Sequence, residues 1–206
     1  MATGSKDGSI KVWNLENQTL IHEFRSGEDG HSKPVNALCQ AYGNSDLIVS
    51  GSDDKSIRIW NISTKTSHNM IKKAHEIGVK SILTVVGSDE KTILISGGKD
   101  GSVIIWDFHE CKPLHEFEEV HEGHVTALAS MRFDTEGLML ISGSSDCSLK
   151  FFDLVEKSYV HTCEKAHSNT INKIVVYPDA SEAIFFTASS DLSIKIWDAW
   201  EKECIQ

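Results

Sequence analysis

The amino-acid sequence predicts an all-β fold made of a repeated antiparallel unit. A pattern of Ser or Thr, Asp four residues later and an aromatic residue six positions beyond the Asp occurs five times, and its aspartates are 47, 46, 46 and 45 residues apart. Short segments of alternating apolar and polar residues surround each copy, which indicates strands. A period of about 40–45 residues is typical of the four-stranded blades of a β-propeller.

The segment that leads to each aromatic residue is the clearest strand. Because successive side chains of a strand point to opposite faces, residues three and one positions before the aromatic share one face, and the aromatic lies on the other. These positions are apolar in every copy: Ile10 and Val12, Ile57 and Ile59, Val103 and Ile105, Leu149 and Phe151, Ile194 and Ile196. Both faces of the strand are therefore expected to be covered, as in stacked sheets.

Three further strands complete each repeat. After the aromatic and a polar turn comes a more polar strand, such as 20–24 or 113–117, which suits the outer edge of a sheet. An apolar inner strand follows, and a short strand such as 92–96 then leads back to the Ser or Thr. The inner strands begin at β-branched residues, each four positions after a histidine: Val35, Val79, Val125 and Ile171. No helix is expected.

The chain resembles the WD40-repeat β-propeller family over essentially its whole length. Five registered copies carry the resemblance, although Gly precedes only His31, Trp-Asn replaces Trp-Asp in two copies, and Phe152 replaces one Trp. The resemblance implies a single domain, 1–206, with a partial blade 1–25, blades 31–72, 75–118 and 121–163, and a truncated blade 167–206. Because seven blades are common in this family, we expect an incomplete ring, a fragment of a roughly seven-bladed propeller.

In that family, the His, the Ser or Thr, the Asp and the Trp of one blade form a hydrogen-bonded tetrad. A buried Asp needs donors, which imidazole and hydroxyl groups supply. The matching residues are His31, Ser50, Asp54 and Trp60; His75, Ser96, Asp100 and Trp106; His121, Ser142, Asp146 and Phe152; and His167, Thr187, Asp191 and Trp197. Phe152 has no indole donor, so we expect replacement of Asp146 to cost less stability than replacement of Asp100.

Ser, His and Asp in one repeat also suggest a nucleophilic triad, and the four loop histidines suggest a metal site. A catalytic set is needed once, whereas these residues recur in register with the fold, so we expect a structural role. Histidines of separate blades lie too far apart to share an ion that needs ligands about 2 Å away. The sequence has no Gly-rich phosphate loop. We expect no catalytic residue, no metal site and no cofactor.

Composition limits the class of partner. The 20 basic and 30 acidic residues give a net charge of −10, without the clustered basic face that nucleic acid requires. The five cysteines are odd in number and show no C-x-x-C spacing, which favours a reducing compartment. No signal peptide or long apolar run is recognisable. We expect an intracellular protein, in the cytoplasm rather than the nucleus.

The resemblance places the binding surface on the face that carries the histidine loops. Its residues flank the start of the inner strand or precede the tetrad Asp. They are Lys6, Pro34, Asn36, Asp53, Gly78, Lys80, Lys99, His124, Thr126, Ser145, Thr170, Asn172 and Ser190. The set is polar and mixed in charge, and Lys6, Lys80 and Lys99 suit a peptide or an acidic segment.

We therefore expect a non-enzymatic scaffold or adaptor that presents this face to proteins or peptides of a multiprotein complex. No direct contact with nucleic acid, membrane or a small-molecule substrate is expected. Two alternatives stay open, because a fold does not fix a function. One is a propeller that recruits substrates for a larger enzyme, such as a kinase or a ubiquitin ligase. The other is a protein-binding subunit of an RNA- or DNA-processing assembly.

Overall fold

The computed structural model describes residues 1–27, 30–87, 89–133, 137–177 and 183–206. Within these residues the chain forms 19 strands and no helix. Accordingly, no segment in the described part of the chain is a helix that could cross a membrane. The prediction of an all-β fold is confirmed.

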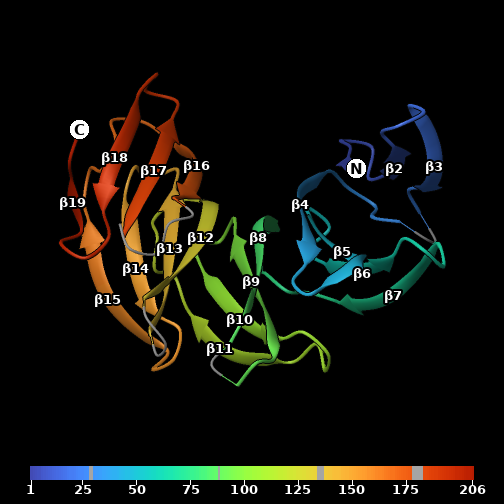
Figure 1. Ribbon diagram of the computed structural model, residues 1–206, viewed down its shortest axis with the longest axis horizontal. Helices are drawn as coiled ribbons and strands as arrows, with labels where there is room; N and C mark the ends of the chain where they lie inside the picture. Colours follow the sequence, from blue (N-terminus) through green and yellow to red (C-terminus); the bar gives the residue numbers. More distant parts are fainter. Residues whose placement is uncertain (28–29, 88, 134–136, 178–182) are drawn as a thin grey trace.

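The strands form five antiparallel sheets, each of which is one blade (Figure 1). Blade 1 contains β1 (Ala2–Gly4), β2 (Ile10–Asn14) and β3 (Thr19–Phe24). Blade 2 contains β4 (Val35–Ala41), β5 (Asn44–Ser52), β6 (Ile57–Asn61) and β7 (Thr66–Ile71). Blade 3 contains β8 (Val79–Val86), β9 (Thr92–Gly98), β10 (Val103–Asp107) and β11 (Pro113–Phe117). Blade 4 contains β12 (Val125–Phe133), β13 (Gly137–Ser144), β14 (Leu149–Asp153) and β15 (Ser158–Cys163), and blade 5 contains β16 (Ile171–Val176), β17 (Ile184–Ser189), β18 (Ile194–Asp198) and β19 (Glu203–Cys204).

The blades form an open arc and not a closed ring. Figure 1 shows blades 1 and 5 at the two ends of the arc, with the other blades between them in chain order. Among the described residues, no strand of blade 1 pairs with a strand of blade 5. The expected incomplete ring is confirmed, while its origin in a roughly seven-bladed propeller stays a prediction.

Blades 2 to 5 share one irregularity where the inner strand begins. The register between the first two strands shifts just after Val35, Val79, Val125 and Ile171. Such a β-bulge leaves one extra residue out of the ladder and redirects its side chain. The extra residues are Asn36, Lys80, Thr126 and Asn172, all of which belong to the predicted binding face.

Apolar side chains between neighbouring blades form the core. At the junction of blades 3 and 4, Val103 and Ile105 of β10 pack in one cluster with Val125 of β12. Val125 lies against Gly97 of blade 3, where an added Cβ would come within 2.5 Å of the Val125 Cγ1. Both faces of β10 are covered, because its three residues at 103, 104 and 105 are all at most 4% exposed.

Candidate functional site

Blade 3 brings its four predicted tetrad residues together. The Nε2 of His75 lies 2.7 Å from the Oγ of Ser96, and its Nδ1 lies 3.1 Å from the Oδ1 of Asp100. The indole Nε1 of Trp106 donates to the same Ser96 Oγ at 2.9 Å. The set therefore ties the loop before β8 to β9, to β10 and to the turn between those two strands.

Blades 2 and 5 repeat this arrangement, and blade 4 repeats it in part. In blade 2 the His31 ring lies 2.7 Å from Ser50 and 2.9 Å from Asp54, and Trp60 donates to Ser50 at 2.8 Å. In blade 5 the His167 ring lies 2.6 Å from Thr187 and 2.8 Å from Asp191, and Trp197 donates to Thr187 at 2.8 Å. In blade 4 the His121 ring lies 2.7 Å from Ser142 and 3.0 Å from Asp146, while Phe152 is fully buried and brings no donor.

The missing donor of blade 4 concerns Ser142 and not Asp146. Asp146 accepts a backbone hydrogen bond from Glu122 at 3.0 Å, as Asp100 does from Glu76 at 2.7 Å. The two aspartates also have equivalent histidine partners. These contacts therefore give no reason to expect that replacement of Asp146 costs less stability than replacement of Asp100. We expect the smaller loss of stability at Ser142 instead, in comparison with Ser96.

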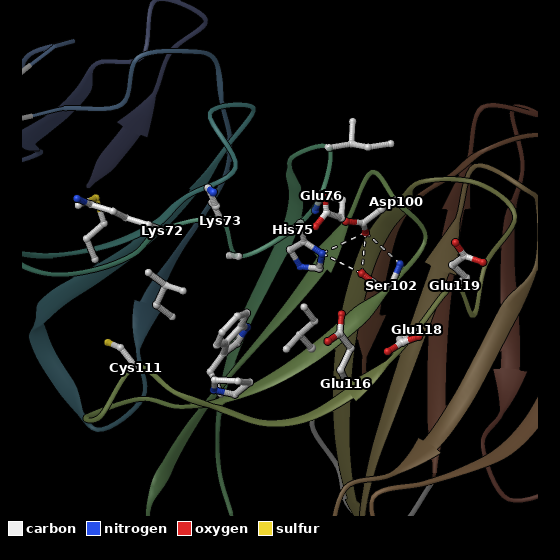
Figure 2. A pocket seen from close by; sticks show the side chains of 17 residues that line it. Lys72, Lys73, His75, Glu76, Asp100, Ser102, Cys111, Glu116, Glu118 and Glu119 are labelled. Carbon is white, nitrogen blue, oxygen red and sulfur yellow. Dashed lines mark hydrogen bonds and ion pairs between the residues drawn. The ribbon is translucent and has the colours of Figure 1, made fainter.

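A fifth member of each network was not predicted: the serine two residues after the Asp. In blade 3 the Oγ of Ser102 donates to Asp100 at 2.7 Å and lies 3.0 Å from the Nδ1 of His75, and Figure 2 shows these three side chains together. Equivalent serines are Ser56, Ser148 and Ser193. A signal was present in the sequence, because Ser occupies this position in all five copies, including Ser9. Ser9 has no matching histidine, and its buried Oγ has no hydrogen-bond partner among the described residues.

The networks set the charge of the tetrad carboxylates. Burial raises the pKa of Asp54, Asp100 and Asp146, but hydrogen bonds from their histidine and serine partners outweigh burial and hold each pKa well below 3.8. In blade 5 the hydrogen bond from Ser193 is the largest cause that lowers the pKa of Asp191. Each network therefore contains an ionised carboxylate at neutral pH.

The connectivity Ser–His–Asp matches that of a nucleophilic triad, but its surroundings do not. In a triad the hydroxyl must reach a substrate carbonyl. Ser50, Ser96, Ser142 and Thr187 are 0% exposed, so none of these hydroxyls can touch a substrate. In three blades the oxygen also accepts the indole hydrogen bond described above. The geometry thus supports hydrogen bonding within the fold and not nucleophilic attack.

Metal-ligating side chains do not converge in the described part of the chain. No group of three or more His, Cys, Asp or Glu residues there is placed to hold an ion. The ring nitrogens of the four loop histidines are occupied by hydrogen bonds within their own blades.

The predicted face contains a polar network that crosses the junction of blades 2 and 3. The Nδ2 of Asn36 donates to Asp53 Oδ1 at 2.6 Å and to the backbone oxygen of Val79 at 2.9 Å. The Nζ of Lys99 lies 2.7 Å from the same Asp53 oxygen. Burial raises the pKa of Asp53, but the hydrogen bonds from Lys99 and Asn36, together with the positive charges of Lys99 and Lys80, outweigh burial and lower the pKa overall. The charge of Lys99 is therefore largely neutralised within the chain.

The other face residues divide into exposed groups and groups used by the fold. Lys6, His124, Asn172 and Ser190 are exposed, Lys80 is half-buried and Gly78 is buried. Thr126 donates to the backbone oxygens of Gly143 and Ile171, and Ser145 accepts from the backbone of His124 at 2.8 Å. The backbone oxygens of Pro34, Gly78, His124 and Thr170 each accept the N–H of the residue before a tetrad Asp. These contacts hold the loops that surround the exposed groups in place.

Comparison with protein-family models gave one match, to the WD40 family described as "WD domain, G-beta repeat". It covers residues 1–14, 18–61, 68–107, 111–153 and 157–198. Each matched repeat from the second onward begins near or within the outer strand of one blade and ends with the third strand of the next blade. Repeat units and blades are therefore offset by one strand. Comparison with individual curated proteins gave no match.

Proposed function

Because the chain belongs to the WD40 repeat family, whose domains generally bind proteins or peptides, we propose that it is a non-enzymatic scaffold whose partner docks on the face of the histidine loops. The observation that carries this proposal is the repeated bulge, which turns Asn36, Lys80, Thr126 and Asn172 out of their strands at equivalent places. Bulges of this kind commonly occur beside binding sites.

The partner is a protein or peptide segment with acidic residues. Lys6 is exposed and Lys80 is half-buried, and neither makes an ion pair with another described residue. Lys99 contributes less, because an acidic ligand would have to compete with Asp53 for it. The burial of the tetrad hydroxyls also supports a non-enzymatic role, because a buried hydroxyl cannot attack a substrate.

The proposed surface can be tested by reversing its free charges. The double variant Lys6→Glu/Lys80→Glu should keep its fold and lose partners that the parent chain retains in affinity purification from its own cells. The matched control is Lys65→Glu/Lys157→Glu, which changes two exposed lysines in the turns at the opposite ends of the blades. Retention of every partner by the Lys6/Lys80 variant would refute the surface.

We also propose that the chain works inside the cell, in the cytoplasm rather than the nucleus. All five cysteines are free, which suits a reducing compartment. Imaging of the tagged chain would test this, and its secretion would refute it.

A further inference from the structure

An open groove of about 900 Å³ separates the outer part of blade 2 from that of blade 3 (Figure 2). Its apolar lining includes Ile71, Ile104 and Trp106, each about 5% exposed. The volume falls within the range of about 300–1,000 Å³ typical of ligand sites. The groove extends to the loop of His75, with Glu76 and Ile77 in its lining, but it shares no residue with the face residues proposed above.

At two other junctions an aromatic side chain occupies the place that Ile71 has beside the groove. In blade 1, Phe24 pairs with Ile10 and packs on Trp60 of blade 2, with ring centroids 4.6 Å apart. In blade 3, Phe117 pairs with Val103 and packs on Phe152 of blade 4 at 4.5 Å.

Ile71 has the equivalent place in blade 2, because it pairs with Ile57. Its side chain is smaller than a phenyl ring. Ile71 and Trp106 belong to one buried cluster, and both line the groove. A phenyl ring thus packs on this aromatic position at two of the other three junctions, whereas the junction of blades 4 and 5 has Cys163, which pairs with Leu149.

The two walls of the groove carry opposite charges. Glu116, Glu118 and Glu119 lie on β11 and just after it, and Lys72 and Lys73 follow β7. Figure 2 shows the glutamates on one side of His75 and the lysines on the other. All five side chains are exposed, and none makes an ion pair with another described residue. Three carboxylates against two ammonium groups favour a cationic ligand.

Each wall includes residues of an edge strand, β7 on one side and β11 on the other. Among the described residues, β7 pairs only with β6, and β11 pairs only with β10. An extended peptide can hydrogen-bond to the free backbone groups of an edge strand while its alternate side chains enter neighbouring pockets. This favours a peptide over a small molecule as the ligand.

We propose that this groove docks an extended basic peptide, which places an aromatic side chain on Trp106 and a lysine or arginine beside Glu116, Glu118 and Glu119. The site borders the His75 loop but shares no residue with the surface proposed for the acidic segment. The chain would thus bind two segments of opposite charge at once.

Titration calorimetry on the full chain with the peptide KFKFKFK tests the proposal, with KAKAKAK and EFEFEFE as comparison peptides. We expect saturable one-to-one binding of KFKFKFK and at least tenfold weaker binding of the other two. Equal affinity for KAKAKAK would show charge attraction without an aromatic pocket, and would overturn the proposal. Absence of KFKFKFK binding would overturn it too.

Two variants locate the binding. Ile71→Phe introduces the ring found at two other junctions, so it should lower the affinity for KFKFKFK at least tenfold, and its melting temperature shows that the variant keeps its fold. Glu116→Gln/Glu118→Gln/Glu119→Gln should also lower the affinity at least tenfold. The control Glu16→Gln/Glu156→Gln changes exposed residues in distant turns and should stay within twofold of the parent. Unchanged affinity in either groove variant would place the peptide elsewhere and refute the site.

Discussion

The hydroxyl of Ser96 accepts one hydrogen bond from an indole and shares another with an imidazole, in a position without solvent. A buried polar group that loses its partner costs about 1–3 kcal/mol. The importance of each tetrad residue therefore depends on how many buried groups its removal leaves unpaired. This count differs between blades, although the sequence pattern is nearly the same.

Replacement of Ser96 by Ala should destabilise the chain more than replacement of Ser142 by Ala. The first change leaves both the Trp106 indole and the His75 ring without their partner, whereas the second affects only the His121 ring. We expect a difference of about 1 kcal/mol in the free energy of unfolding. Urea unfolding of the two variants measures it, and equal losses would contradict the assignment of the deficit to Ser142.

Acid should weaken the fold through the tetrad carboxylates. The folded pKa of Asp54, Asp100 and Asp146 is depressed below the ordinary value of 3.8, so their stabilisation is complete above that pH and is lost as the pH falls toward the folded pKa. The free energy of unfolding should therefore decrease below about pH 4.

Asp100→Asn, with Glu16→Gln as an exposed control, isolates one carboxylate. The Asn variant should be less stable than the parent at pH 7, and its stability should fall less steeply below pH 4. A slope identical to that of the parent would show that Asp100 does not contribute to the acid response.

At the scale of the strand, the glycine that precedes the tetrad Asp by three residues decides how closely two blades approach. Gly4, Gly51, Gly97 and Gly143 all lie against the β-branched residue that begins the next inner strand. Blade 5 has Ala188 at this place, and among the described residues no inner strand packs against it.

Gly97→Ala should lower the free energy of unfolding by about 1–3 kcal/mol, because overpacked cores lose stability of that order. Its Cβ would lie 2.5 Å from the Val125 Cγ1, which is buried and has little room to move. Ala188→Gly is the matched control and should change stability much less. Thermal unfolding of both variants provides the comparison, and a neutral Gly97→Ala would refute the close approach.

The strands and tetrads could be predicted from sequence because their signals are local. Alternation of apolar and polar residues predicted the strand that leads to each aromatic residue. A constant spacing of four residues linked each loop histidine to the β-branched residue that begins the inner strand. The recurrence of serine at the position of Ser102 is also evident in the sequence. Its role depends on its contacts with Asp100 and His75, which form only when the turn is folded. The groove beside Trp106 could not be predicted, because its lining combines residues of two blades, such as Ile71 and Trp106.

At the scale of the whole molecule, the main contacts between described strands of different blades join neighbouring blades, as in other repeat architectures. The consequence is visible at blade 5, where Ile194 is 72% exposed although its equivalents Ile57 and Leu149 are 0% exposed. In blades 2 and 4 the following blade covers this position, and no described blade follows blade 5. Stability should therefore be highest in the middle of the arc and lowest at its ends.

The central claim is that the Ser–His–Asp sets are local structural networks and not a reactive site. Hydrogen exchange of the parent chain and of His75→Ala tests it most directly. We predict faster amide exchange in blade 3, mainly in the His75 loop and the Asp100 turn, with blades 1 and 5 unchanged. Unchanged exchange in blade 3, together with loss of a measurable activity, would contradict the account.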